Sequence, residues 1–529
     1  MRFLLVNPFY PISETPSPPL GLAFLAGALE RAGVEVRLLD LVVHPYSRDR
    51  LEALIDEFRP DAVGATAVTM TFDHAIEIIE DVKRVAPGVR TVMGGPHVSF
   101  CGPETMLRYS ALDFVVLGEG ELTIVELAEA MDRGSGWERI PGLIYRLGPE
   151  IVSTEWREPV ADVDSLPQPA RHLVPLGRYR ALGMPVSMTT SRGCPFNCIF
   201  CVGRKMVGAK VRYRDPIQVV DELEYLSTLD FHQINIADDL FTANKKHCHA
   251  VCDEIIRRGL KTKWTSFARV DTVSREVLAK MREAGCDAVS FGIETANAEI
   301  LKTIRKGITT DQVVEAIQMC IDTGVTPFGS FILGLPGETP ETIAETLAFG
   351  DRIKAMGTSY GFHLLAPFPG TEVREQSEKY GLKILTDDWR EYHANRSIVE
   401  TETVTREMMD DIVIEWEREF DEYLGDIKQR RELGQTTPEE AWPLDKLEHT
   451  VLIYDLMMNG AIEERGHWPQ GPGPVSEAEA LATLADRIMD RTRESRAQVE
   501  STLGYALGKG ALELREEDGL LRWAWVEYL

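Results

Sequence analysis

The first 147 residues alternate short apolar runs with amphipathic stretches, which predicts that strands and helices alternate along the chain. Apolar runs predict strands at Arg2–Asn7, Val34–Asp40, Ala62–Thr66, Arg90–Gly94 and Asp113–Leu117. Helical spacing occurs between them, at Leu20–Ala32, Arg48–Phe58, Asp73–Ala86 and Glu121–Arg133. This alternation predicts a doubly wound parallel sheet of the α/β class, which binds ligands at the carboxyl ends of its strands.

A second alternating series occupies residues 185–395, after a proline-rich segment at 148–184 that predicts a linker. Its predicted strands are Val186–Thr190, Gln233–Ala237, Lys263–Phe267, Ala288–Ile293, Thr326–Leu333 and Ser359–Leu365. Six strand–helix units predict a partial (β/α)6 barrel whose active site lies at the C-terminal ends of the strands. Residues 396–529 show mainly helical spacing and predict a mostly helical C-terminal domain, with a short hairpin within 511–529.

Composition narrows the classes of function. The 529 residues are enough for three domains, and the net charge of −27 argues against a nucleic-acid partner. No apolar run reaches the length of a membrane span, and the apolar start at Met1–Asn7 stops at Pro8, as in a buried strand rather than a secretory signal. Eight cysteines in so long a chain favour a metal site in a reducing compartment over a disulfide framework, so we expect a cytoplasmic protein.

The strongest chemical signal is the spacing of Cys194, Cys198 and Cys201, which is C-x3-C-x2-C. Three thiolates on one loop suit three corners of an iron–sulfur cubane. A missing fourth ligand leaves one iron open, and the amino and carboxylate groups of a ligand can chelate an open iron. The alternatives are a zinc site that lacks its last ligand and a chance clustering of cysteines.

Together with Phe200, this loop resembles the hallmark of radical S-adenosylmethionine (SAM) enzymes, in which a 4Fe-4S cluster cleaves SAM to methionine and a 5′-deoxyadenosyl radical. Segments at later predicted strand ends also match the family in order. The resemblance implies that the SAM-binding residues are Phe200, Asp238, Asp239, Arg269, Glu294 and Gly334. For Arg269 and Glu294, a role in an ordinary ion pair is the alternative.

The N-terminal segments Asn7-Pro8, Pro19–Leu22, Gly94–His97 and Gly118–Glu121 resemble the cobalamin-binding domain that precedes the barrel in one subgroup. The chain has no Asp-x-His-x-x-Gly motif, so the resemblance implies cobalamin without a histidine on the metal. For His97 it implies a place beside the nucleotide tail or at a helix start, with metal ligation as the alternative. The implied cobalamin contacts are Asn7, Thr66, Thr69, Met70, Thr71, Gly94, Gly95, His97, Gly118 and Glu119. A domain that has lost its cofactor, or that binds another nucleotide, is the other interpretation.

The resemblance covers residues 1–395 and implies cobalamin-dependent radical methylation of an unactivated carbon in a small-molecule or lipid-like substrate. It also implies an electron donor such as flavodoxin or ferredoxin. Two alternatives stay open, a non-methylating cyclisation or rearrangement with the same cofactors, such as ring closure on a tetrapyrrole, and a cobalamin sensor or carrier. The sequence identifies no catalytic residue beyond the cofactor ligands. Cys248 and Cys252, four residues apart, fit either a second metal corner or a buried helix face.

Overall fold

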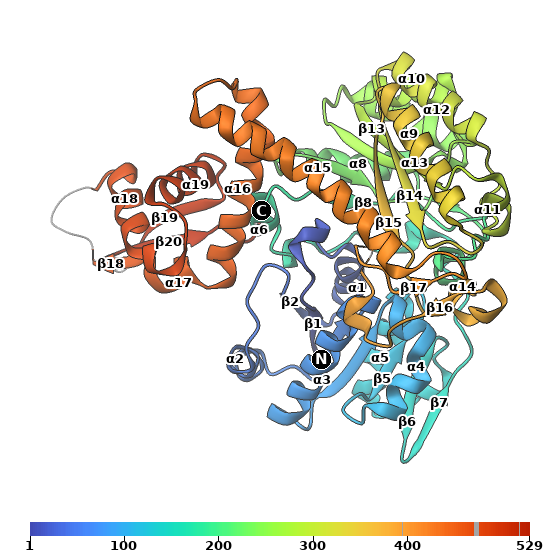
Figure 1. Ribbon diagram of the computed structural model, residues 1–529. Coiled ribbons are helices and arrows are strands. Elements are labelled where there is room, and N and C mark those ends of the chain that lie inside the picture. The colour runs from blue at the N-terminus through green and yellow to red at the C-terminus, as the bar shows by residue number, and fades with distance from the viewer. Residues whose placement is uncertain (394, 470–474, 518) are drawn as a thin grey trace.

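The computed structural model describes residues 1–393, 395–469, 475–517 and 519–529. Two α/β units lie one above the other, and a mostly helical unit, which contains the C-terminus, lies beside both (Figure 1). The predicted fold class is confirmed for each of the three units. None of the helices in the described residues is long and apolar enough to cross a membrane.

The N-terminal unit is a seven-stranded sheet in the order β2-β1-β3-β4-β5-β6-β7. Its parallel strands are β1 (Arg2–Asn7), β2 (Glu35–Asp40), β3 (Ala62–Thr66), β4 (Arg90–Gly94) and β5 (Phe114–Val116). Alternate residues of β1 enter two cores. Phe3 and Leu5 pack under α1 (Leu20–Arg31) and α5 (Glu121–Arg133), while Leu4 and Val6 face α2 (Arg48–Phe58), α3 (Phe72–Val85) and α4 (Pro96–Arg108). Burial on both faces explains the continuous apolar runs in these strands.

This sheet continues beyond residue 147, where the sequence predicts a linker. Strands β6 (Leu143–Leu147) and β7 (Glu150–Ser153) form an antiparallel hairpin at the edge of the sheet, turning at Gly148 with φ +59°. A short helix, α6 (Leu176–Ala181), follows within the same segment. Residues 148–184 are therefore partly structured, because the first of them complete the sheet.

The second unit is a six-stranded parallel sheet in the order β15-β14-β13-β12-β11-β8. Its strands are β8 (Val186–Met188), β11 (Ile234–Ile236), β12 (Trp264–Ala268), β13 (Cys286–Glu294), β14 (Thr326–Leu333) and β15 (Ser359–Leu364). Between them come α8 (Pro216–Ser227), α9 (Lys245–Arg258), α10 (Arg275–Glu283), α11 (Ala298–Thr303), α12 (Thr310–Thr323) and α13 (Pro340–Ala355). Strands β8 and β15 are the two ends of the sheet, so the barrel is open between them.

The C-terminal unit contains α15 (Arg406–Glu432), α16 (Pro438–Met458), α17 (Ala461–Arg465), α18 (Glu477–Ile488) and α19 (Arg496–Gly508). The predicted hairpin is present as β19 (Leu512–Glu517) and β20 (Leu520–Trp525), and a third strand, β18 (His467–Pro469), pairs with β20. The first turns of α15 belong to the barrel, since Met409 packs on Leu333 and Leu364.

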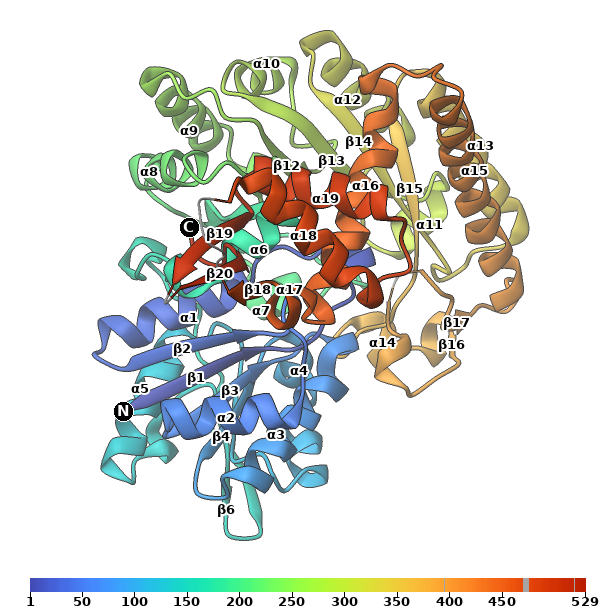
Figure 2. The same ribbon diagram turned by 90° about the vertical axis from the view of Figure 1, so that its left-hand side faces the viewer.

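The C-terminal unit is anchored to the rest of the chain through α6. The guanidinium of Arg178 donates to Glu527 at 2.7 Å and to Glu463 at 2.6 Å, and also to the backbone oxygen of Val43. Tyr179 is buried in a core that includes Trp523 of β20. The helices of the C-terminal unit consequently lie against both α/β units (Figure 2).

Candidate functional site

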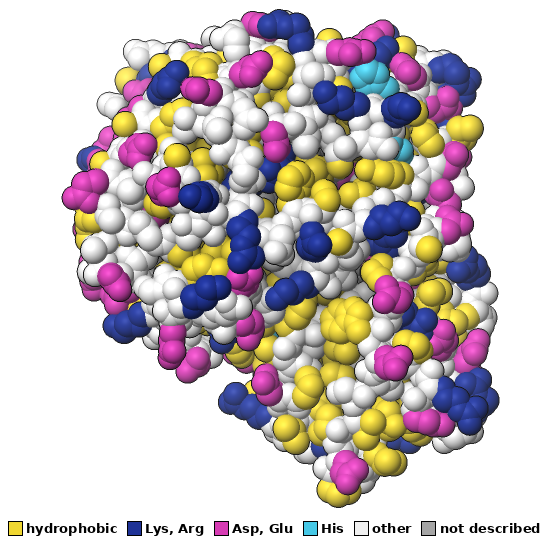
Figure 3. All heavy atoms as spheres, turned by 90° about the vertical axis from the view of Figure 1, so that its right-hand side faces the viewer, with side chains coloured by type: hydrophobic (Ala, Val, Ile, Leu, Met, Phe, Trp, Pro, Cys, Tyr) yellow, Lys and Arg dark blue, Asp and Glu magenta, His cyan; other side chains and the backbone are white. Residues whose placement is uncertain are grey.

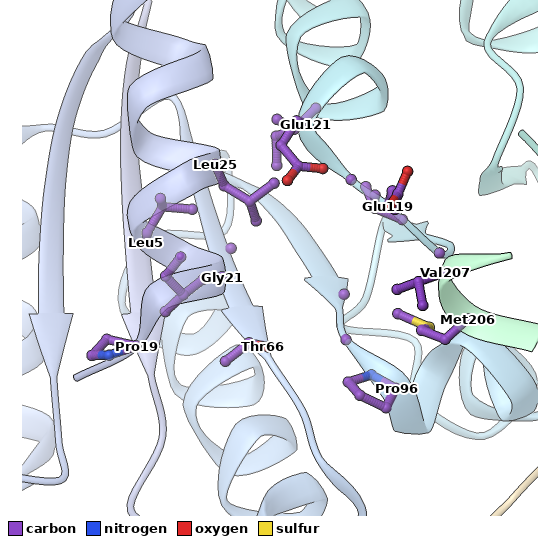
Figure 4. A pocket seen from close by; sticks show the side chains of 18 of the residues that line it. Leu5, Pro19, Gly21, Leu25, Thr66, Pro96, Glu119, Glu121, Met206 and Val207 are labelled. Carbon is purple, nitrogen blue, oxygen red and sulfur yellow. The ribbon is translucent and has the colours of Figure 1, made fainter. Parts of the chain in front are cut away.

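A cavity of about 500 Å³ lies between the carboxyl edge of the N-terminal sheet and the C-terminal ends of the barrel strands β8 and β11. We call it the interdomain cavity. Leu5, Gly21 and Thr66 line it from the N-terminal unit, and Met206 and Val207 lie opposite them on the segment that follows the three cysteines (Figure 4). Its further lining residues include Asn7, Gly94, Gly95, Gly118, Glu119, Ser191 and Asp239.

Glycines form much of the N-terminal wall of this cavity. Gly95 has φ +100°, and a Cβ there would lie 2.7 Å from the backbone oxygen of Ala67, so the position requires glycine. A Cβ at Gly21 would have no atom within 4 Å, because that side of α1 faces open space. Where glycines form the wall, a bulky ligand can approach the backbone closely.

Four of the residues expected to contact cobalamin do not line the cavity. Thr69, Met70 and Thr71 form a 3-10 turn, η2 (Thr69–Thr71), that packs against the turn η8 (Trp389–Glu391) of the barrel unit. His97 is 1% exposed, packs on Phe72 with tilted rings at 4.2 Å between ring centroids, and meets Trp389 edge-on at 4.9 Å. Burial lowers the pKa of His97 to about 4, so the imidazole is neutral at pH 7. These residues form a contact between the two α/β units.

Glu119 lines the cavity, but its carboxylate is already bound. Oε1 and Oε2 accept from the two terminal nitrogens of Arg212 at 2.7 and 2.8 Å, and Oε2 also accepts from the backbone N–H of Val160 at 2.9 Å. Arg192 lies 3.6 Å from the same carboxylate and 2.7 Å from Glu121. Both glutamates therefore join the N-terminal sheet to the barrel segment that carries the cysteines.

The three cysteines lie on residues 193–201, the three-cysteine loop, which follows the short strand β9 (Ser191–Arg192). Gly193 has φ +113°, and a Cβ there would lie 2.5 Å from the backbone oxygen of Lys210. The amide of Ile199 donates to the backbone oxygen of Ile304 at 3.3 Å, which anchors the loop on the barrel. The cysteines thus lie at the C-terminal end of the barrel strands, beside the interdomain cavity.

The thiols of the three-cysteine loop have charged and polar neighbours. Burial raises the pKa of Cys198, and the nearby cations Lys306 and Arg269 lower it. The amide of Gly203 donates to Sγ of Cys201 at 3.3 Å, a contact that would stabilise a thiolate. Among the described residues, no three Cys, His, Asp or Glu side chains converge to hold one metal ion.

The adjacent residues Asp238 and Asp239 have different surroundings. Asp238 is buried and accepts three hydrogen bonds, from the backbone N–H of Thr190 at 2.6 Å, its hydroxyl at 2.6 Å, and the hydroxyl of Ser191 at 2.7 Å. Asp239 lines the interdomain cavity and accepts from the amide of Gly193 at 3.1 Å. Asp239 therefore faces the cavity with its carboxylate, whereas Asp238 holds the strand end through its buried hydrogen bonds.

Arg269 and Glu294 both form ion pairs, the alternative that the sequence leaves open for them. Arg269 donates twice to Asp271, each bond 2.9 Å long, and its guanidinium lies 3.6 Å from the ring centroid of Phe196 in the three-cysteine loop. Glu294 accepts from Nζ of Lys306 at 2.6 Å and has φ +68°, a strained value for this residue. Both pairs lie close to the thiol of Cys198.

Two further candidate SAM residues lie at the barrel end. Gly334 has φ +89°, and its amide donates at 2.6 Å to Oε2 of Glu338, a buried residue that the sequence analysis missed. Burial raises the pKa of Glu338 to about 8. Phe200 is partly buried, and its ring packs on the barrel core. This packing orients the three-cysteine loop. The -Gly334-Leu-Pro-Gly-Glu338- spacing is the signal that would have drawn attention to Glu338.

Two phenylalanines on the inner face of the barrel were also missed. Phe267 is 52% exposed in β12 and Phe328 is 37% exposed in β14, although both strands are central. Both residues pair in register with Ser290 of β13. In each strand the residues before and after the phenylalanine are buried and face the helices, so the phenylalanine faces the inside of the barrel. The concave inner face thus presents two aromatic rings on either side of a serine.

Comparisons with known proteins match both α/β units. A model of the radical SAM superfamily matches residues 188–350, and a B12-binding-domain model matches residues 13–128. The uncharacterized methyltransferase PH0819 of Pyrococcus horikoshii is 36% identical over 417 residues, covering 77% of this chain and 90% of that protein. The anaerobic magnesium-protoporphyrin IX monomethyl ester cyclase of Rubrivivax gelatinosus is 30% identical over 438 residues, covering 79% and 77%.

Solved structures share the fold. The cobalamin-dependent SAM radical enzyme OxsB with aqua-cobalamin has a TM-score of 0.69 at 17% identity, covering 96% of this chain and 84% of that one. The radical SAM methyltransferase TsrM from Kitasatospora setae, with cobalamin and a [4Fe-4S] cluster, has a TM-score of 0.62 at 24% identity, covering 74% and 84%. The OxsB match spans all three units of the chain.

Proposed function

The chain belongs to the cobalamin-dependent radical SAM enzymes, and we propose that it methylates an unactivated carbon of a small-molecule or lipid-like substrate. Its family cofactors are a 4Fe-4S cluster, SAM and cobalamin. When bound, the cluster and SAM supply a radical that removes a hydrogen atom, and cobalamin supplies the methyl group. Membership of this enzyme family excludes the alternative of a cobalamin sensor or carrier.

The observation that carries the proposal is the composition of the interdomain cavity. One wall comes from the carboxyl edge of the N-terminal sheet, at Thr66 and Gly94, and the facing wall comes from the barrel end, at Ser191 and Asp239. A substrate carbon between these walls would have the cobalamin side and the SAM side on opposite faces. This is the arrangement that methyl delivery to a carbon radical needs.

We assign separate tasks to the residues of each unit. In the barrel, Cys194, Cys198 and Cys201 would hold the cluster, and Asp239 would bind the ammonium of SAM by a charge-assisted hydrogen bond. The pairs at Arg269 and Glu294 would hold the loop and the strand end around SAM. In the N-terminal unit, the glycines and Thr66 would hold cobalamin in the cavity.

The substrate would enter from the concave side of the barrel. The inner face there carries Phe267 and Phe328 with Ser290 between them, and the hydrogen-bonded pair Asn235 and Thr265 lies on β11 and β12. Exposed rings beside hydroxyl and amide groups suit an uncharged, partly apolar substrate. Residues 396–529 would complete the site. We also propose a cytoplasmic location and a reducing protein partner, in keeping with eight free cysteines.

A radical cyclisation with the same cofactors is the second candidate, and one observation favours it. The cyclase of Rubrivivax gelatinosus is 30% identical to this chain, against 36% for the Pyrococcus methyltransferase. Methylation is the first candidate because the methyltransferase match also covers 90% of that protein. The two reactions differ in one product. Methylation converts SAM to S-adenosylhomocysteine, and cyclisation does not.

The test uses anaerobic protein supplied with iron, sulfide and cobalamin. Stoichiometric corrinoid together with 5′-deoxyadenosine under reduction supports the assignment of both cofactors, and S-adenosylhomocysteine in addition supports methylation. Deoxyadenosine without S-adenosylhomocysteine in the presence of a turned-over substrate would favour cyclisation. Absence of deoxyadenosine would overturn the proposal.

A cavity-filling variant tests the cobalamin site without disturbing the fold. In Gly21→Leu, the new side chain enters open space from α1, and leucine is favoured over glycine in a helix by up to about 1 kcal/mol. We expect the variant to lose corrinoid and keep its thermal stability. Gly88→Leu, at a loop position that also has open space around its Cβ, is the control that should keep corrinoid.

A further inference from the structure

We propose that Asp40 is a positioning residue for the corrinoid. It holds the side-chain amide of Asn7 with the oxygen toward the interdomain cavity, where that oxygen accepts a hydrogen bond from a carboxamide side chain of the corrin ring. Tyr179 completes this arrangement, and we call Asn7, Asp40 and Tyr179 the amide-orienting triad. The inference rests on the proposed function, because it presupposes that the cavity binds cobalamin.

The triad begins at the carboxyl edge of the N-terminal sheet. Asn7 and Asp40 are the last residues of the neighbouring parallel strands β1 and β2, and they pair directly in register. Nδ2 of Asn7 donates to Oδ1 of Asp40 at 2.8 Å. Asn7 is partly exposed and lines the cavity, whereas Asp40 is 1% exposed. Asp40 therefore reaches a ligand in the cavity through Asn7.

The carboxylate of Asp40 selects one end of the amide. Three donors converge on it, since Oδ1 also accepts from the backbone N–H of Val42 at 3.1 Å and Oδ2 accepts from the hydroxyl of Tyr179 at 2.9 Å. Burial raises the pKa of Asp40, and these hydrogen bonds lower it. Because an ionised carboxylate can only accept hydrogen bonds, it binds the nitrogen of the Asn7 amide and not the oxygen.

Tyr179 occupies the second hydrogen of the same amide. Burial raises the pKa of Tyr179 well above its usual value, and a hydrogen bond that Asn7 donates to the phenol oxygen lowers it. A side-chain amide has two N–H donors and one oxygen. One donor goes to Asp40 and the other to Tyr179, so the oxygen is the polar atom of Asn7 that remains for a ligand.

Asn7 lies at the rim of the cavity. It is the last residue of β1, as Thr66 is of β3 and Gly94 of β4, and all three line the cavity. Leu5 and Val92 line it further from this edge, each two residues earlier in its strand, so the inner part is apolar. The edge of a corrin ring carries carboxamides, and a desolvated N–H without an acceptor is costly. The oxygen of Asn7 supplies such an acceptor at the rim.

The triad also connects the cavity to the C-terminal unit. The ring of Tyr179, on α6, is buried in a core that includes Trp523 of β20. The backbone oxygen of Asp40 lies 2.9 Å from Nδ1 of His44, and Nε2 of His44 lies 3.2 Å from Oε1 of Glu527. Residues from distant parts of the chain thus fix one amide, which explains why the sequence around Asn7 does not reveal its orientation.

The experiment measures corrinoid affinity and needs no turnover. Corrinoid-free protein is titrated with hydroxocobalamin and, separately, with dicyanocobinamide, which keeps the ring carboxamides and lacks the nucleotide tail. The corrinoid absorbance gives Kd. Hydrophobic side chains are scattered among charged ones on the face that carries α11, and a corrinoid can adsorb on them (Figure 3). Only the saturable, stoichiometric binding is therefore compared between variants.

The triad predicts two losses that are not additive. Asn7→Ala removes the acceptor, so Kd should rise about five- to tenfold with both corrinoids. In Asp40→Asn, the new amide can accept from Tyr179 with its oxygen and then turns its nitrogen toward Asn7. The Asn7 amide turns in response and presents N–H to the cavity, so Kd should rise at least as much. The double variant should bind like Asn7→Ala alone, because Asp40 acts through Asn7.

Two variants control for stability. Tyr179→Phe removes a buried hydrogen bond to the same carboxylate and leaves the bond between Asn7 and Asp40. It should lower the melting temperature and bind both corrinoids with nearly the wild-type Kd. Thr450→Val removes a hydrogen bond from α16 to the backbone oxygen of Leu182, just after α6, and should also keep the wild-type Kd.

Each outcome decides between the proposals. An unchanged Kd in Asn7→Ala would overturn the inference, even if Asp40→Asn does not fold. Additive losses in the double variant, or equal losses in Tyr179→Phe and Asp40→Asn, would also overturn it, because they indicate a purely structural role. A loss with hydroxocobalamin but not with dicyanocobinamide would overturn the assignment to the ring. A wild type that binds neither corrinoid would instead refute the cobalamin site of the proposed function.

Discussion

The neighbouring carboxylates Asp238 and Asp239 should separate folding from SAM binding. Asp238→Ala removes the acceptor of three buried hydrogen bonds, while Asp239→Ala removes a carboxylate from the wall of the interdomain cavity. We therefore expect Asp238→Ala to lower thermal stability and Asp239→Ala to lower SAM affinity. Sequence resemblance alone assigns the two residues the same role.

The size of each effect follows from the contacts. Asp238→Ala leaves donors of Thr190 and Ser191 without a partner, and each buried donor without an acceptor costs about 1–3 kcal/mol. The three together should cost at least about 3 kcal/mol. For a folding unit of roughly 150–250 residues, this lowers the melting temperature by about 6–12 °C. A lost charge-assisted bond from Asp239 to the ammonium of SAM, worth about 1.5–3 kcal/mol, weakens binding by roughly 10- to 100-fold.

The assay pairs anaerobic thermal melts with equilibrium dialysis of labelled SAM on the reconstituted protein. Asp238→Asn serves as the matched variant, since it keeps one acceptor and should fall between the wild type and the alanine variant in stability. The reasoning is refuted if Asp238→Ala melts like the wild type but no longer binds SAM. It is equally refuted if Asp239→Ala binds SAM normally.

Three further predictions follow from buried or exposed groups. Because burial raises the pKa of Glu338 from 4.5 to about 8, its stabilising effect is complete below pH 4.5 and is lost as the pH rises to 8. The free energy of unfolding should fall from pH 6 to pH 8 by up to about 1.4 kcal/mol per pH unit, the melting temperature should fall with it, and Glu338→Gln should remove this slope. Phe267→Ala and Phe328→Ala should raise KM for the substrate several-fold in product assays and leave substrate-free SAM cleavage unchanged. Gly95→Ala should lower the melting temperature and corrinoid content together, because φ +100° disfavours alanine and the new Cβ meets Ala67.

The parallel strands of the two sheets were predictable because they are buried on both faces. Ala62–Thr66 and Arg90–Gly94 are predicted with the bounds that the structure has, since an apolar run flanked by polar residues marks a covered strand. Edge elements lacked this signal. Glu150–Ser153 is half exposed, and His467–Pro469 has three residues with a proline, so neither shows a pattern that stands apart from a loop.

The part of the site whose residues lie close together in the sequence was predictable. The three cysteines and Gly193 lie within nine residues, and the spacing itself expresses the geometry of a cluster loop. The surroundings of His97 were not predictable, because Trp389, nearly three hundred residues away, buries it. Glu119 is similar, since the arginine that occupies its carboxylate comes from the barrel. A sequence motif identifies the residues that contact a ligand only when no residue from another structural unit already binds their side chains.

The residues that join the units would set the distance between the two proposed cofactor sites. Glu119 and Arg212 connect the glycine wall to the segment after the cysteines, and His97 and Trp389 connect the same two units elsewhere. Breaking a buried ion pair by removing one partner costs about 3–5 kcal/mol, more than a typical surface contact. Methyl delivery needs the substrate carbon in line with both cofactors, and a displacement of about 1 Å can cost roughly 100-fold in rate. Residues that contact neither cofactor should therefore control the reaction as strongly as residues that do.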